Sequence, residues 1–291
     1  MTIRNIVASL RPTQWTKNVF VAAALIFAKK IFDVPLLLRT LAAIGVFCIL
    51  SGSHYLFNDV LDIEEDKIHP RKSGRPVAAG LIRPVQALFL AGVLGAASLV
   101  LALLLNTGFF FAAATYLVLQ IAYSIKLKHV VLLDIFLIAS GFVLRVVAGG
   151  LVIRVPVSHW LLLCTMLGAL FLAIIKRRHE LLTLSDMAAA HRPILSEYSF
   201  RFLDQMASVV ASSAILAYCL YTLSEETIRK IGSDRLIYTT PFVVYGIFRY
   251  LYLVHQKNLG GNPEDLLFRD GPLFVSIVLW VAASVVIIYV H

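Results

Sequence analysis

Long apolar segments recur along the whole chain, and they limit its possible folds more than any other feature of the sequence. A helix needs roughly 20 predominantly apolar residues to cross the hydrocarbon core of a bilayer. By that measure the sequence contains nine candidate transmembrane helices. Their approximate bounds are 18–32, 36–57, 85–105, 108–125, 130–152, 157–175, 206–223, 236–254 and 272–290. We therefore expect an all-α polytopic membrane protein.

The composition supports this class of protein. Hydrophobic residues make up 59% of the 291 residues and charged residues only 15%, whereas soluble domains are about a quarter charged. The net charge of +9 indicates basic residues on the cytoplasmic side and contacts to phosphate-bearing substrates, rather than nucleic acid. The three cysteines lie in apolar runs without metal-ligand spacing, so we interpret them as buried hydrophobic residues.

Lysine and arginine are unevenly divided between the two sides of the predicted bundle. The N-terminus and the even-numbered joints hold 18 of the 26 Lys and Arg residues, and the odd-numbered joints hold 7. Such an excess marks the cytoplasmic side of a bacterial-type inner membrane protein. We expect the N-terminus and the three long joints there, together with the active site. The predicted fold is one domain over 1–291, with about nine helices around a central polar cavity open to the cytoplasmic face.

The most charged stretch, NDVLDIEEDKIHPRKSGRPVAAG, begins at residue 58, where the second span ends. If the helix continues, Asp59, Asp62 and Asp66 share one helix face, with Asn58 beside them. Three carboxylates in a row repel one another unless a cation lies among them, and Mg²⁺ prefers carboxylates, waters and substrate phosphates. We predict a Mg²⁺ site at these three acids. A solvated, charged helix end is the alternative.

Basic residues follow the acids directly. Arg71, Lys72 and Arg75 surround a Pro and a Gly, and such a loop can fold over phosphates, which Arg binds through paired hydrogen bonds. Positive charge retained on the cytoplasmic side is the alternative. The same two interpretations apply to further polar stretches at the ends of spans. These contain Lys17, Tyr123, Lys126, Lys128, Lys176, Arg177, Glu180, Asp265 and Arg269.

Two ionisable residues, Asp134 and Arg145, lie within the fifth span, about three turns apart. An ionisable residue inside a membrane indicates a functional site. His54 lies one turn before Asn58 and serves either as a hydrogen-bond donor behind the acids or in packing. No nucleophile–base pair, Walker loop or His/Cys metal cluster is recognisable in the sequence. Catalysis would therefore rely on a metal ion and basic residues that stabilise an anionic leaving group.

The order of these motifs resembles the UbiA superfamily of intramembrane prenyltransferases over nearly the whole chain. The run Asn58-Asp59-x-x-Asp62-x-x-x-Asp66 is similar to the first Asp-rich motif of that family, which binds Mg²⁺ and a pyrophosphate. The second Asp-rich motif, expected after the sixth helix, is replaced by KRRHELLTLSD, beginning at Lys176.

This departure is typical of one branch of the family, the decaprenyl-phosphate phosphoribosyltransferases. The chain resembles that branch in RPTQWTKN, in NDVxDxEEDxxHPxKxxRPVAAG, in the segment 123–128, in Arg145 before AGG, in KRRxEL and in NPEDxxxRD. The resemblance implies an enzyme that transfers the 5-phosphoribosyl group of phosphoribosyl pyrophosphate to a polyprenyl phosphate. Its cofactor would be Mg²⁺, and its product a lipid-linked pentose precursor for cell-envelope glycans.

The resemblance also implies roles for individual residues. Asp59, Asp62 and Asp66 would hold the metal ion and take part in catalysis. The basic residues after them would bind the phosphates of the donor, and basic residues of other joints would hold the head group of the lipid. The implied substrate-binding residues are Lys17, Asn58, Arg71, Lys72, Arg75, Tyr123, Lys128, Arg145, Lys176, Arg177, Glu180, Asp265 and Arg269.

Two other functions remain as alternatives. A UbiA-type prenyltransferase acting on an aromatic acceptor would need the second acidic pair, which is absent from the sequence. A non-catalytic transport or lipid-binding membrane protein would be favoured by paired Gly/Pro-broken helices in two halves, which we do not find. The sequence leaves the length of the lipid open and is compatible with a homo-oligomer.

Overall fold

All regular secondary structure in the described part of the protein is helical, which confirms the predicted all-α class. The computed structural model describes residues 2–68, 72–184, 193–260, 266 and 269–289. Eight helical segments in these ranges are long and apolar enough to cross a membrane. They are α3 (Val34–Leu61), α5 (Pro84–Leu105), α6 (Thr107–Ile125), α7 (Leu133–Ile153), α8 (His159–Leu184), α10 (Phe200–Leu223), η5 (Arg235–Thr239) with α12 (Thr240–Gln256), and α14 (Gly271–Tyr289).

The first predicted span, 18–32, differs from the other eight. The chain there forms η1 (Pro12–Ala22), an 11-residue 3-10 helix, which continues into the 5-residue α-helix α2 (Ala23–Phe27). A 3-10 helix rises about 2.0 Å per residue and an α-helix about 1.5 Å. The two together extend roughly 30 Å, which is close to the thickness of the hydrocarbon core. The number of nine spans stays a prediction.

The helices form two compact units. The first contains residues Met1–Val157 with Ala190–Ile194, and the second contains Ser158–Ala189 with Leu195–His291. We describe each unit by itself. The single domain expected over 1–291 stays a prediction.

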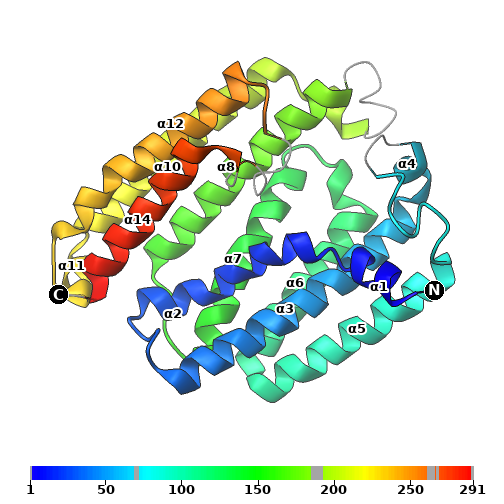
Figure 1. Ribbon diagram of the computed structural model, residues 1–291, viewed down its shortest axis with the longest axis horizontal. Coiled ribbons are helices and arrows are strands. Elements are labelled where there is room, and N and C mark those ends of the chain that lie inside the picture. Colours follow the sequence, from blue (N-terminus) through cyan, green and yellow to red (C-terminus); the bar gives the residue numbers. More distant parts are fainter. Residues whose placement is uncertain (1, 69–71, 185–192, 261–265, 267–268, 290–291) are drawn as a thin grey trace. The chain divides into compact units, whose positions relative to one another are not determined.

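In the first unit α3 packs against α5, α6, α7 and η1 (Figure 1). The ring of Phe47 on α3 makes edge contacts with two rings of α6, at centroid distances of 5.7 Å to Phe109 and 5.4 Å to Tyr116. Such aromatic pairs stabilise a core beyond the apolar area that they bury. The centre of this unit therefore lies between α3 and α6, and the polar ends of both helices are held in fixed relation.

The N-terminal segment lies against α3 and α7 at two glycines. A Cβ atom at Gly149 of α7 would be 2.0 Å from the carbonyl oxygen of Val21, so only glycine allows η1 to approach this closely. A Cβ atom at Gly52 of α3 would be 2.8 Å from the side chain of Leu10. Leu10 follows α1 (Ile3–Ser9). The first contact holds η1 against α7, and the second holds the corner between α1 and η1 against α3.

The acidic stretch interrupts the helix at one residue. α3 ends at Leu61, Asp62 is its C-cap, and α4 (Ile63–Ile68) follows. The N–H of Asp62 still donates to the Asn58 carbonyl at 3.0 Å, and the N–H of Asp66 donates to the Asp62 carbonyl at 2.8 Å. The predicted continuous helix is therefore broken at Asp62, which still bonds through its backbone to Asn58 on one side and to Asp66 on the other.

In the second unit α8 packs against α10, and α12 packs against α10 and α14 (Figure 1). The hydroxyl of Tyr218 on α10 bonds to the Thr239 hydroxyl at 2.6 Å and accepts from Trp280 Nε1 at 2.8 Å. Polar groups within a bilayer must be satisfied by the protein itself, and this network does so. Besides the helices of both units named so far, the described residues form three short helices: α11 (Glu225–Ile231), η2 (Leu127–His129) and η4 (Pro193–Glu197).

Candidate active site

Asp59, in the last turn of α3, is a buried member of the predicted metal ligands, with 1% of its surface exposed. Its Oδ1 accepts from two guanidinium groups, those of Arg11 and of Arg75, the latter through Nη1 at 3.2 Å. Its Oδ2 is buried and has no hydrogen-bond partner among the described residues. A buried carboxylate is costly unless paired, and the two arginines supply that pairing.

Asp66, in α4, is the second buried acid. Its Oδ2 accepts from Arg75 Nη1 at 2.6 Å, and its Oδ1 lies 3.9 Å from Lys72 Nζ. The same nitrogen of Arg75 also contacts Asp59, so one base bridges two of the three acids. The basic segment after α4 therefore folds back over the acids that precede it.

Asp62, at the break between α3 and α4, has a different basic partner. Its Oδ1 pairs with Lys128 of η2, and its Oδ2 accepts from Asn58 Nδ2 at 2.7 Å. The Oδ1 of Asn58 accepts in turn from the hydroxyl of Ser124 in α6, also at 2.7 Å. Lys128 and Asn58 were predicted from the sequence to bind substrate, whereas Ser124 was not. These bonds connect the polar end of α6 to the polar end of α3.

We define the acid cluster as Asp59, Asp62 and Asp66. The basic side chains that pair with this cluster outnumber its three carboxylates. Arg11, Lys72, Arg75 and Lys128 all pair with one or two of these carboxylates. Four cationic side chains and three carboxylates leave one excess positive charge before any ligand binds. A concentrated positive field of this kind attracts a polyanion. The arrangement therefore suits a substrate with several phosphates.

The cluster also offers oxygen ligands for a metal ion. Nowhere in the described ranges do three or more side chains of the His, Cys, Asp and Glu types converge as a ready metal site. Asp59 and Asp66 meet on Arg75, whereas Asp62 pairs with Lys128. The unpartnered Oδ2 of Asp59 is a hard oxygen ligand of the kind that a divalent cation prefers. The carboxylates of the acid cluster fit a divalent cation. That all three of them hold one ion together stays a prediction.

Arg11 contacts the acid cluster and was not among the residues predicted from the sequence. It lies between α1 and η1 with a left-handed backbone (φ +50°), and its guanidinium group stacks 4.7 Å from the centre of the Tyr55 ring. Trp15 Nε1 donates to the Leu10 carbonyl at 3.1 Å, which closes this corner. The sequence contained a signal for this residue, because Arg11 is the first residue of the motif RPTQWTKN. From that motif only Lys17 was predicted to bind substrate.

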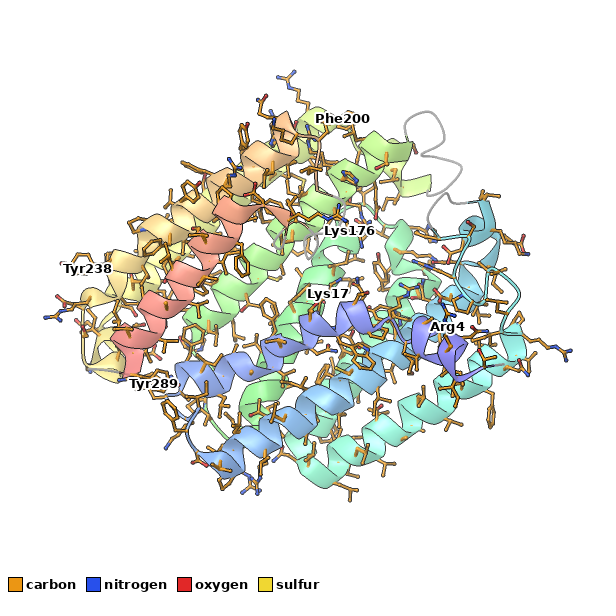
Figure 2. The ribbon with its side chains drawn as sticks, viewed as in Figure 1. Arg4, Lys17, Lys176, Phe200, Tyr238 and Tyr289 are labelled. Carbon is orange, nitrogen blue, oxygen red and sulfur yellow. The ribbon has the colours of Figure 1, made fainter. Side chains whose placement is uncertain are left out.

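Lys17 and Tyr123 belong to the same unit as the acid cluster. Lys17 lies on η1 (Figure 2), and its Nζ donates to Gln14 Oε1 at 2.5 Å. Tyr123 is half-buried in the last turn of α6, immediately before Ser124. Their roles in substrate binding stay predictions.

Arg145 is buried in α7, with 4% of its surface exposed, and all its partners are uncharged. Nε donates to Asn18 Oδ1 at 2.8 Å, Nη2 to the Tyr116 hydroxyl at 2.9 Å, and Nη1 to the Gly141 carbonyl at 2.9 Å. The guanidinium group also stacks 4.7 Å from the centre of the Tyr116 ring. No acid in the described part of the chain forms an ion pair with it. Arg145 thus links η1, α6 and α7 and keeps a buried positive charge.

His54 and Asp134 are the other buried ionisable residues that the sequence analysis singled out in this unit. His54 is 5% exposed, and its Nδ1 has no partner among the described residues. Asp134 is fully buried in the first turn of α7. The burial of these two side chains fits a functional role and fits packing equally well, so both interpretations stay open.

The residues predicted after the sixth span belong to the second unit. Lys176 lies on α8 (Figure 2) and is half-buried. Arg177 is 1% exposed and donates from Nη1 to Glu180 Oε2 at 2.5 Å. Arg269 is exposed. Arg71 and Asp265 lie outside the described residues. The assignment of these six residues to substrate binding stays a prediction.

The chain is similar to known proteins over nearly its whole length. The model of the UbiA prenyltransferase family matches residues 18–278. The decaprenyl-phosphate phosphoribosyltransferase of Mycobacterium tuberculosis is 34% identical over 284 residues, which cover 96% of this chain and 93% of that protein. The protein of the same name from Corynebacterium glutamicum is 34% identical over 290 residues, covering 98% of this chain and 86% of that protein.

A solved structure supports the fold. The UbiA homologue from Archaeoglobus fulgidus bound to GPP and Mg²⁺ superimposes with a TM-score of 0.72, covering 98% of this chain and 99% of that chain at 17% sequence identity. This similarity confirms the predicted polytopic all-α architecture. The chain is a multi-pass membrane protein.

Proposed function

We propose a function that starts from one premise: this chain belongs to the UbiA prenyltransferase family. Within that family it is a phosphoribosyltransferase, which transfers the 5-phosphoribosyl group of phosphoribosyl pyrophosphate to a polyprenyl phosphate. One observation carries this conclusion, namely the 34% identity over nearly the full length to proteins named decaprenyl-phosphate phosphoribosyltransferase. The excess of bases around the acid cluster supports it, because the donor carries two separate phosphate groups.

The acid cluster and the bases of the loop after α4 bind the donor. Arg75 and Lys72 contact Asp66 from the loop after α4, and they are well placed to receive phosphate oxygens when the donor enters. Arginine is suited to this task because its planar guanidinium group donates two parallel hydrogen bonds to a phosphate. A divalent ion, Mg²⁺ in our proposal, held by Asp59, Asp62 and Asp66 would neutralise part of the charge on the departing pyrophosphate.

The acceptor is a lipid whose phosphate must reach the same region from the membrane. We assign its head group to Lys17, Tyr123 and Lys128, which come from η1, from the end of α6 and from η2. The buried charge of Arg145 adds to the positive field in this unit. Lys176 and Arg177 remain candidates for the same task, as do Glu180, Asp265 and Arg269 for the hydroxyl groups of the ribose.

The chemistry needs no general base. An oxygen of the acceptor phosphate forms a bond to the anomeric carbon of the ribose, and the bond from that carbon to the pyrophosphate oxygen breaks. The electron pair of the broken bond leaves with pyrophosphate. Because a phosphate monoester is already anionic near neutral pH, no proton has to be removed. This agrees with the absence of a nucleophile–base pair from the sequence.

We place the site on the cytoplasmic side. The side that carries the N-terminus also carries 18 of the 26 Lys and Arg residues, and such an excess faces the cytoplasm. Phosphoribosyl pyrophosphate is charged and water-soluble, so it reaches the site from that side. The product, polyprenyl-phosphoryl-ribose 5-phosphate, stays in the membrane as a lipid-linked pentose precursor.

A label-transfer assay tests the proposal. Membranes that contain the protein should transfer ribose label from phosphoribosyl pyrophosphate into an organic-extractable lipid when polyprenyl phosphate and Mg²⁺ are present. Chelation of the metal with EDTA should abolish the transfer, and added Mg²⁺ should restore it. Absence of lipid-bound label under all these conditions would contradict the proposal.

A further inference from the structure

We propose that the ion pair between Arg11 and Asp59 makes the binding of metal and of donor mutually dependent. Arg11 holds Asp59 in the unloaded protein, and the pyrophosphate of the donor draws Arg11 away, which releases Asp59 to the metal ion. Arg11 is then a positioning residue with two successive partners, a carboxylate and a phosphate. This inference rests on the proposed function for the identity of the donor.

The two oxygens of Asp59 are used unequally. Oδ1 receives both Arg11 and Arg75, whereas Oδ2 receives no hydrogen bond in the described part of the chain. A metal ion that approaches Oδ2 therefore meets a carboxylate whose charge is already shared by two guanidinium groups. Repulsion between these cations and the metal weakens its binding. Removal of one guanidinium group lowers that repulsion and leaves Asp59 paired with the other.

Arg11, rather than Arg75, is the arginine that can leave. Arg75 contacts Asp59 and Asp66 at once, so its departure would break two ion pairs and remove the closest partner of Asp66. Arg11 pairs with one carboxylate among the described residues. When it leaves, Asp59 keeps the 3.2 Å contact to Arg75. The unfavourable state of a buried, unpaired charge therefore does not arise.

The position of Arg11 suits an exchange of partners. Its side chain is 22% exposed, whereas that of Asp59 is 1% exposed, so the base covers the acid from the accessible side. Its backbone is held by the contact between Leu10 and Gly52, and its guanidinium group rests on the Tyr55 ring. A fixed backbone and a partly exposed end allow the guanidinium group to turn from the carboxylate to an incoming anion without movement of the helices.

The consequence is a coupling between two ligands. If the anion removes Arg11 from Asp59, the anion tightens metal binding, and by linkage the metal tightens anion binding by the same factor. Coupling of this kind is typically worth 5- to 150-fold in affinity. Loss of Arg11 has opposite effects on the two ligands when each binds alone: the metal gains affinity because a competing cation is gone, and the anion loses affinity because a phosphate partner is gone.

The test uses purified full-length protein in detergent, with Mn²⁺ as a paramagnetic substitute for Mg²⁺ and inorganic pyrophosphate as the anion. Bound Mn²⁺ is measured by electron paramagnetic resonance with and without pyrophosphate, after correction for the Mn²⁺–pyrophosphate complex formed in solution. The variants are Arg11→Gln and Arg11→Lys. The matched control is Lys67→Gln, since Lys67 also pairs with an acid, Glu64 at 2.7 Å, but on the exposed side of α4.

In the wild type and in Lys67→Gln, pyrophosphate should tighten Mn²⁺ binding by about tenfold or more. In Arg11→Gln, Mn²⁺ alone should bind tighter than to the wild type, and the tightening by pyrophosphate should be several-fold smaller than in the wild type, because only the direct attraction between metal and pyrophosphate remains. Arg11→Lys should lie between the two. Weaker Mn²⁺ binding in Arg11→Gln without pyrophosphate, or unchanged coupling in either Arg11 variant, would overturn the proposal.

The outcome separates this inference from the proposed function. Inorganic pyrophosphate is the part that phosphoribosyl pyrophosphate shares with prenyl diphosphates, so the coupling is measurable whichever donor the enzyme uses. A second titration with phosphoribosyl pyrophosphate and with geranyl diphosphate identifies the donor. Coupling with pyrophosphate and with geranyl diphosphate only would leave the Arg11 exchange intact and refute the donor. Absence of coupling with all three anions in the wild type would refute the exchange.

Discussion

Arg75 and Asp66 form an ion pair at 2.6 Å, in which a base from the loop after α4 is bound to an acid with 2% of its side chain exposed. The same base reaches Asp59 at 3.2 Å. In the charged stretch that begins at residue 58, a base from the second half thus pairs with two of the acids in the first half. Two of the acids expected to hold a metal ion are connected by a residue expected to bind phosphate.

Arg75→Gln should destabilise the protein because it leaves two buried carboxylates without this bridging partner. Loss of one partner from a buried ion pair costs about 3–5 kcal/mol. Thermal unfolding in detergent should show a clear drop in Tm. Lys67→Gln is the control, because the exposed pair of Lys67 and Glu64 contributes at most about 1 kcal/mol. Equal Tm values for the two variants would contradict the bridging role.

Asp59→Asn should abolish turnover without unfolding the protein. The amide keeps the shape of the side chain but removes the negative charge that attracts the metal ion, and metal-derived charge stabilisation is worth several kcal/mol, or about 100-fold or more in rate. The measurement is the label-transfer rate together with Tm. Glu64→Gln removes an exposed acid from the same stretch and should keep the rate. A normal rate in Asp59→Asn would remove Asp59 from the metal site.

Tyr116→Phe should weaken the buried site around Arg145. The substitution removes the hydroxyl that accepts from Arg145 Nη2 at 2.9 Å, and a buried charged donor without its acceptor costs about 1–3 kcal/mol. Tm should fall accordingly. Tyr245→Phe is the control, since Tyr245 is 49% exposed. An unchanged Tm for Tyr116→Phe would show that Arg145 does not depend on this bond.

Gly149→Ala should disrupt the contact between η1 and α7. The new Cβ atom would be 2.0 Å from the Val21 carbonyl oxygen, and overpacking of this kind costs about 1–3 kcal/mol or more. Gly92→Ala on α5 is the matched control, because no atom lies within 4 Å of its new Cβ and alanine favours a helix by up to about 1 kcal/mol. The two substitutions should change Tm in opposite directions, and a shared direction would contradict the close approach.

Much of the fold could be predicted from the sequence, because the features concerned are local. Length and apolarity located eight helices that are able to span a membrane. Helical spacing predicted that Asp59, Asp62 and Asp66 lie close together. Asp59 and Asp66 share the partner Arg75, and the three-acid metal site stays a prediction. The break of the helix at Asp62 is one residue long and leaves the apolar pattern unchanged, so the pattern gave no sign of it.

The partners from distant segments could not be predicted. Arg11 reaches Asp59 only because Leu10 lies against Gly52, and Ser124 reaches Asn58 only because α6 packs along α3. Neither contact follows from helical periodicity, which describes one segment at a time. The long 3-10 helix η1 was hidden for the same reason, since its apolar residues resemble those of an ordinary α-helical span.

The most direct test of the central claim is a competition between donors and acceptors in one reaction. Purified protein would receive phosphoribosyl pyrophosphate, geranyl diphosphate, polyprenyl phosphate and an aromatic acid together with Mg²⁺, and mass spectrometry would identify the lipid products. The account predicts polyprenyl-phosphoryl-ribose 5-phosphate and free pyrophosphate, with the aromatic acid unchanged. A prenylated aromatic acid without phosphoribosylated lipid would contradict it.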